Sequence, residues 1–164
     1  MKAGIISDTH DHHKNVLTAI DIFKENKVRY IFHAGDLVAP FTAAAFADVK
    51  SAKFIAVFGN NDGDRLLLSE KIQEFGGQIH PYCFKGEVGG KKIYMTHTQH
   101  HIEEVAGSQR YDLVIYGHTH EQDIRKVGES LVLNPGESTD WITGTSHVII
   151  LELNDMSYEV KKLG

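Results

Sequence analysis

The sequence contains one cysteine, one tryptophan and only three prolines among its 164 residues. A single cysteine, Cys83, excludes an internal disulfide framework and favours a reducing compartment. No segment approaches the roughly twenty consecutive apolar residues of a membrane-spanning helix. No secretory signal is visible, because Met1 and Lys2 lead directly into a short apolar segment. We therefore expect a cytoplasmic protein without a membrane partner.

Basic residues are not in excess either. The chain has 17 Lys and Arg against 22 Asp and Glu, which gives a net charge of −5. Proteins that bind along nucleic-acid backbones usually carry a basic patch, so the charge gives no strong nucleic-acid-binding signal and disfavours a nuclease. The length suits one domain over residues 1–164, large enough to bury roughly two-thirds of its unfolded surface.

The first half of the chain alternates short apolar segments with helical patterns. Strands are predicted at 1–6, 29–33 and 53–58, and helices at 11–26, 40–49 and 64–75. This order predicts a parallel sheet flanked by helices. The second half is rich in strands, predicted at 78–88, 91–95, 112–116, 123–127, 130–133, 146–153 and 158–162, with one helix at 101–108. We therefore expect an α/β sandwich of two sheets covered by helices.

Polar side chains follow five of the predicted strands. They are Asp8 with His10, Asp36, Asn60, His97, and His118 with His120. Ligands of open α/β sheets bind at the carboxyl ends of the strands. Oxygen and nitrogen donors without a thiolate suit Mn²⁺, Fe, Ni²⁺, Co²⁺ or Zn²⁺ rather than Ca²⁺ or Mg²⁺ alone. Seven donors are too many for one four-coordinate ion, and they indicate two ions that share a carboxylate.

The spacing within the clusters supports this interpretation. Asp8 and His10 are separated by one residue, and so are His118 and His120. If the chain is extended at these points, both members of each pair project to the same side. Glycine lacks a Cβ and lets a backbone turn sharply beside a ligand. It precedes three of the clusters, at Gly35, Gly59 and Gly117.

Four members of the set also have a simpler interpretation. Asp8 and His10 fit an ordinary turn, Asn60 fits a left-handed turn position, and His97 fits a hydrogen-bonded core histidine. His100 and His101 either reach the site or lie on the surface. The remaining histidines are interpreted as surface or packing residues: His12, His13, His33, His80 and His147.

The ordered set resembles the motifs of the calcineurin-like metallophosphoesterases. The matching residues are Asp8-x-His10, Gly35-Asp36, Gly59-Asn60-x-Asp62, His97 and Gly117-His118-x-His120. The short length and Asn134-Pro135-Gly136 resemble the compact archaeal and bacterial phosphodiesterase branch. This resemblance implies a four-layer αββα sandwich of two mixed sheets. It also implies that Asp8, His10 and His120 bind one metal, that Asn60, His97 and His118 bind a second, and that Asp36 bridges them.

The resemblance further implies hydrolysis of small phosphodiesters, by in-line attack of a water or hydroxide that bridges two divalent ions. Asp36, Asn60 and Asp62 would be the catalytic residues. Manganese is the favoured metal, with nickel, cobalt, iron or zinc as alternatives. A phosphomonoesterase is a second possibility, and a non-enzymatic protein-interaction scaffold, such as the retromer subunit with this fold, is a third. A homo-oligomer is left open.

Two departures from the family pattern concern the substrate side. Asn61 replaces a histidine that protonates the leaving oxygen in the larger family, and Asp62 loses its expected partner. An amide cannot donate a titratable proton, so the general-acid contribution is absent unless another group supplies it. Thr98 and Gln99 replace a Gly-His pair after His97. Arg65 is predicted either to bind a phosphate oxygen or to lie exposed on a helix.

Overall fold

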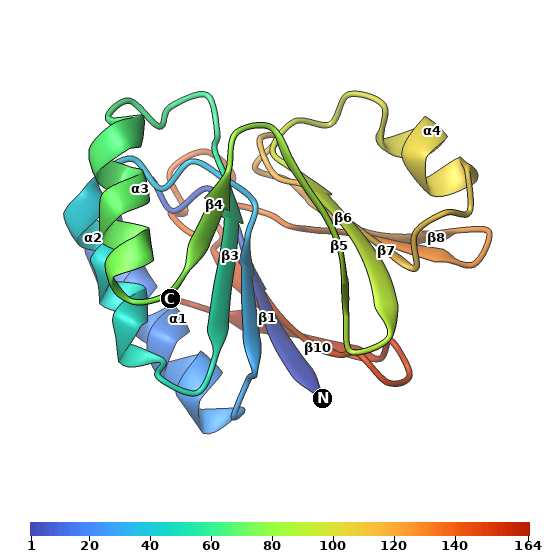
Figure 1. Cartoon of the computed structure of the whole chain (residues 1–164), viewed down its shortest axis with the longest axis horizontal. Coiled ribbons are helices and arrows are strands. Elements are labelled where there is room, and N and C mark those ends of the chain that lie inside the picture. The colour runs from blue at the N-terminus through green and yellow to red at the C-terminus, as the bar shows by residue number, and fades with distance from the viewer.

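Two β-sheets pack face to face in the computed structural model, which describes residues 1–164, and helices cover both outer faces (Figure 1). The first sheet has six strands in the order β11-β10-β1-β2-β3-β4. The second has five strands in the order β5-β6-β7-β9-β8. The predicted four-layer αββα sandwich is thus confirmed.

The first sheet is built from the predicted βα units. Its strands β1 (Lys2–Ile6), β2 (Tyr30–His33), β3 (Lys53–Val57) and β4 (Gln78–His80) run parallel. Two antiparallel strands, β10 (His147–Glu152) and β11 (Tyr158–Lys162), extend it beyond β1. Its outer face is covered by α1 (His13–Glu25), α2 (Pro40–Ala44) and α3 (Arg65–Glu74). The predicted helix at 40–49 is α-helical only to Ala44 and continues as a 3₁₀ turn over Ala45–Asp48.

The second sheet has a parallel centre and antiparallel edges. Strands β6 (Lys91–Thr96), β7 (Leu113–Ile115) and β9 (Ser130–Pro135) are parallel, and β5 (Cys83–Val88) and β8 (Gln122–Val127) form the edges. The short helix α4 (Ile102–Gly107) lies on the outer face. The prediction of one strand over 78–88 was wrong. Pro81 has no N–H to continue a ladder, and the chain leaves the first sheet after β4 and enters the second with β5.

The hydrophobic core has two principal layers. Between the sheets, 17 buried residues pack together, among them Ile5, Phe32 and Met95. Between the first sheet and its helices there is a second cluster of 18, among them Ile6 and Phe23. The first sheet is therefore buried on both faces, which explains why β1 reads as a continuous apolar segment rather than an alternating one. No helix in the structure combines the length and apolar character needed to cross a bilayer.

This topology brings the polar strand ends together. The loops after β1 and β2 are joined where the Asp8 amide donates to the Gly35 carbonyl at 3.0 Å. The loops after β6 and β7 are joined where the Gly117 amide donates to the His97 carbonyl at 2.9 Å. A third bond, from the Ser138 amide to the Asp8 carbonyl at 3.2 Å, links the chain after β9 to the loop after β1. Loops from both sheets therefore meet at one edge of the sandwich.

One histidine beneath this edge is fully buried. His33 ends β2, and its Nδ1 accepts a hydrogen bond from the Gly35 amide at 3.2 Å. Its Nε2 lies 3.2 Å from the Thr9 hydroxyl, so a neutral ring protonated at Nε2 satisfies both contacts. Burial lowers the pKa of His33 to about 3, against a smaller opposing effect of Asp36. The ring is thus held neutral as part of the fold.

Stability should therefore fall as the pH drops below the ordinary histidine pKa of 6.5. In that range the unfolded chain takes up a proton on His33 that the folded chain excludes down to about pH 3. The free energy of unfolding should lose up to about 1.4 kcal/mol per pH unit from this group. Denaturant titrations of chelator-treated protein should show a shallower pH dependence for His33→Gln, which cannot titrate. Equal slopes for the two proteins would contradict this assignment.

Candidate metal centre

All seven predicted ligand side chains converge at the shared edge of the two sheets. Asp8 and Asp36 lie at the centre and are buried. The other donors are linked to them by short distances, directly or through a neighbour: His10, Asn60, His97, His118 and His120. The cluster combines residues from both sheets, which no local segment of the chain could do.

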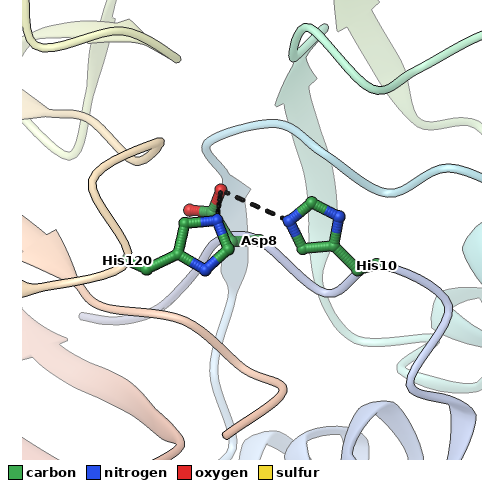
Figure 2. A group of neighbouring side chains, drawn as sticks. All are labelled: Asp8, His10 and His120. Carbon is green, nitrogen blue, oxygen red and sulfur yellow. Dashed lines mark ion pairs between the residues drawn. The ribbon is translucent and has the colours of Figure 1, made fainter. Parts of the chain in front are cut away.

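One half of the cluster consists of Asp8, His10 and His120 (Figure 2). The Asp8 Oδ1 atom lies 3.9 Å from His10 Nε2 and 3.6 Å from His120 Nε2. The two rings stack with centroids 5.1 Å apart. His10 Nε2 is buried and has no hydrogen-bond partner. A buried nitrogen without a partner is costly unless something else binds it, so this atom fits a metal ligand.

The other half surrounds Asp36. Its Oδ2 atom lies 3.5 Å from His10 Nε2 and 3.5 Å from His97 Nε2, so a single oxygen faces both halves. His97 Nε2 is also 2.9 Å from the Asn60 amide oxygen, and the His118 ring lies 5.0 Å from the His97 ring. A carboxylate in this position fits the bridging role that the sequence predicts for Asp36.

The two central carboxylates differ in their electrostatics. Burial raises the pKa of Asp8. Burial alone would also raise the pKa of Asp36, but hydrogen bonds from His97 and the Asn61 amide hold it well below its ordinary range. Ser7 is the closest donor to Asp8, with its hydroxyl 2.6 Å from Oδ2. No lysine or arginine neutralises either carboxylate, so the donor set fits divalent cations.

The backbone at the cluster is strained. Five of the seven predicted ligands have positive φ angles: Asp8 (52°), His10 (38°), Asp36 (58°), His118 (70°) and His120 (62°). The expectation of extended chain through both paired motifs was therefore wrong. Main-chain bonds impose the turn at the first pair, where the Asp8 and His10 amides donate to the Gly35 and Asp36 carbonyls. Positive φ is unfavourable for residues with a Cβ, and such strain is concentrated at functional sites.

Two glycines permit the close approach of loops. A Cβ on Gly59 would lie 2.0 Å from Asp36 Oδ1, and a Cβ on Gly117 would lie 2.0 Å from the Ser7 hydroxyl. Neither distance is physically possible, so any other residue would displace the Asp36 side chain and backbone at Gly59, or the Ser7 and Asp8 side chains at Gly117. The groups that approach these glycines are atoms of Asp36, Ser7 and Asp8, and the approach of a ligand to them stays a prediction.

Asp62 binds the main chain rather than another side chain. Its carboxylate accepts hydrogen bonds from the amides of Asp36 at 3.1 Å, Val38 at 2.7 Å and Gly59 at 2.6 Å. Asn61 contacts the side chain of Asp36, and its side-chain amide donates to Oδ2 at 2.8 Å. Asp62 therefore fixes the backbone of the two loops that carry Asp36 and Asn60.

The structure also places the residues for which the sequence left two interpretations. Arg65 is exposed and opens α3, and its guanidinium donates to the Asp62 and Gly59 carbonyls at 3.1 Å and stacks over Phe58. His100 and His101 are exposed on the loop before α4. His12 caps α1 by accepting the Asn15 amide at 3.2 Å.

The sequence analysis missed one carboxylate, Glu137. It is fully buried, and it accepts a hydrogen bond from His120 Nδ1 at 3.1 Å and others from Thr139 and Thr143. Burial alone would raise its pKa, but the bonds from Thr139, Thr143 and His120 lower the pKa of Glu137 to about 2. An ionised partner on Nδ1 leaves Nε2 of His120 free to bind a metal. Its position after Asn134-Pro135-Gly136 was the only signal in the sequence.

Comparison with known proteins identifies the family. The family model described as "calcineurin-like phosphoesterase superfamily domain" matches residues 1–156. A phosphodiesterase of Methanocaldococcus jannaschii is 39% identical over 161 residues, which cover 96% of each chain. The chain belongs to the calcineurin-like phosphoesterase superfamily. The predicted resemblance is thus confirmed.

Solved structures of the superfamily agree. An archaeal phosphodiesterase is 38% identical, with a TM-score of 0.93 over 99% of this chain and 100% of the other. Vps29 of Entamoeba histolytica, described in complex with Zn²⁺, has a TM-score of 0.70 at 22% identity, over 99% of this chain and 98% of the other. This second likeness shows the shared fold alone, because fold does not specify function within a superfamily.

The contact between Glu137 and His120 predicts a loss of metal affinity in Glu137→Gln. In this variant a neutral amide replaces the ionised acceptor that orients His120, so the affinity for Mn²⁺ should fall about 10-fold to 100-fold. Competition titration with a chelator measures this affinity, and the thermal shift on Mn²⁺ addition should shrink in parallel. The matched control is Glu129→Gln, on an exposed turn. Wild-type affinity in Glu137→Gln would show that the contact does not support metal binding.

Proposed function

We propose that this chain is a metal-dependent phosphodiesterase that hydrolyses small phosphodiesters. The observation that carries the proposal is the convergence of all seven donors, with the unpartnered His10 Nε2 aimed at both central carboxylates. The relative from Methanocaldococcus jannaschii, which bears the name phosphodiesterase, supports the choice of reaction. Free Cys83 is consistent with our expectation of the reducing cytoplasm as its location.

Some residues of the site would bind the metal ions, and others position those ligands. Asp8, His10 and His120 would hold one divalent ion, Asn60, His97 and His118 the other, and Asp36 both, with Mn²⁺ favoured. When bound, the ions supply a nucleophilic water and neutralise charge on the phosphoryl oxygens. Asn61 orients the Asp36 carboxylate through its 2.8 Å bond. The contacts of Asp62 favour a positioning role over the catalytic role that the sequence suggested.

The surface beside the site suits a small substrate. A cavity of about 300 Å³ adjoins Asn60 and His97, and it is also lined by Arg65 and the exposed ring of Tyr82. This volume accommodates one ester group of a small diester. The net charge of −5 also favours a small substrate over a nucleic-acid strand.

The proposal is tested by turnover of bis(p-nitrophenyl) phosphate with added Mn²⁺. Wild-type protein should hydrolyse it, and Asp36→Asn should lose at least about 100-fold in rate, because several kcal/mol of charge stabilisation depend on the ions. Asp21→Asn, an exposed substitution on α1, should behave as wild type. Metal binding without any turnover would support the protein-interaction scaffold instead. Equal activity in Asp36→Asn would refute the role of this carboxylate.

The substitution at Asn61 predicts strong selectivity for the leaving group. No imidazole occupies this position, and both oxygens of Asp62 are bound to main-chain amides. The departing oxygen must therefore carry its own negative charge, and aryl phosphodiesters should react at least about 100-fold faster than alkyl ones. A series of aryl esters, with chemistry confirmed as rate-limiting, should give a steep dependence on leaving-group pKa.

Asn61→His sharpens this test. The substitution would remove the amide that donates to Asp36, and the Asp62 carboxylate already accepts main-chain amides and cannot orient the new imidazole. The variant should therefore keep the steep dependence of rate on leaving-group pKa. A shallow dependence in the wild type would instead reveal a proton donor elsewhere in the site.

A further inference from the structure

The only tryptophan of the chain is exposed beside the metal centre. Trp141 lies in the turn after β9, and 63% of its surface is accessible to solvent. Tryptophan is the largest apolar side chain, and one left this exposed adds little to the core. The packing of the fold does not account for the ring.

The turn that carries Trp141 is fixed by groups other than its ring. Glu137 accepts the amides of Ile142 at 3.0 Å and Thr143 at 2.6 Å, and also the Thr143 hydroxyl at 2.8 Å. The same carboxylate accepts from His120 Nδ1 at 3.1 Å. One buried group therefore holds both a predicted metal ligand and the turn with the exposed ring. Substitutions of the ring should leave this turn in place.

The ring lies against the histidines of the β1 loop. Its centroid is 6.5 Å from that of His10 and 5.6 Å from that of His12. His10 Nε2 is in turn 3.5 Å from Asp36 and 3.9 Å from Asp8. A phosphoryl group held at this cluster would be only one side chain away from the indole. An ester group on that side of the phosphorus would reach the indole surface.

We propose that Trp141 is an aromatic platform for a flat ring, a nucleobase or an aryl group, carried by one ester arm of the substrate. The inference rests on the proposed function and adds the substrate class and a specificity-determining residue. Indole faces stack on any π-face, which favours aromatic arms over saturated ones without a requirement for one particular base. An aryl arm selected by Trp141 would also be a good leaving group, whereas a nucleobase arm would be an alkyl ester through its sugar and would gain in binding alone.

Because Trp141 is the sole tryptophan, the tryptophan fluorescence of the protein reports on binding at this ring. Wild-type protein at constant Mn²⁺ is titrated with adenosine 5′-monophosphate and, in parallel, with ribose 5-phosphate, which keeps the phosphate and lacks the ring. Adenosine monophosphate should quench the tryptophan fluorescence and bind about 5-fold to 100-fold more tightly. Ribose 5-phosphate should bind weakly and leave the fluorescence nearly unchanged.

Variants separate the ring from the fold. In Trp141→Ala, calorimetry should find that adenosine monophosphate binds no better than ribose 5-phosphate, and that ribose 5-phosphate binds as in the wild type. Trp141→Phe should retain part of the preference. The matched control is Ile142→Ala, which removes an apolar neighbour that is also exposed and should keep the full preference. Thermal unfolding should be alike in all four proteins.

The outcomes distinguish this inference from the proposed function. Ring-selective binding without turnover of bis(p-nitrophenyl) phosphate would support the platform and refute the phosphodiesterase. Three results, each obtained with turnover intact, would refute the platform alone. They are equal binding of the two monophosphates by the wild type, binding of neither, and an equal loss of affinity for both in Trp141→Ala. A dimer that forms in the wild type and is lost in Trp141→Ala would assign the ring to a contact between chains, and this result would also overturn the platform.

Discussion

Two carboxylates buried without a cationic side chain are the constraint on which this edge of the molecule depends. Asp8 and Asp36 lie between the ends of two sheets, and imidazoles and amides are their neighbours. An isolated buried charge is very costly, and neutral imidazoles do not remove that cost. Divalent cations do, and this is the physical reason that the donor set fits a metal centre better than a polar core.

The surrounding structure holds that arrangement in place from two sides. Asp62 binds three main-chain amides of the loops after β2 and β3, while Glu137 binds His120 and the turn after β9. Each is a buried carboxylate satisfied by several donors, the situation in which burial of charge rigidifies its surroundings. Of the five predicted ligands with positive φ, they contact Asp36 and His120 directly.

The fold by itself does not decide what such a chain does. Vps29 of Entamoeba histolytica shares the architecture at 22% identity, and the shared fold alone does not specify a function. In this chain the convergent donors support catalysis. Three groups around them bear on the substrate: an amide where an acid would be needed, a small cavity at Tyr82, and an exposed indole at Trp141.

The sequence by itself determined the order of strands and helices, the sandwich of two sheets and the polar residues at the strand ends, because apolar periodicity is a local property of the chain. The resemblance of the ordered motifs implied the four-layer αββα arrangement. Tertiary structure decided the rest. The break between β4 and β5, the turned backbone at Asp8 and His118, and the bonds of Asp62 and Glu137 all depend on partners distant in the sequence. Such contacts produce no periodic pattern in the sequence, since a buried carboxylate can accept hydrogen bonds from many different amides. Only the folded chain decides which amides lie close to it.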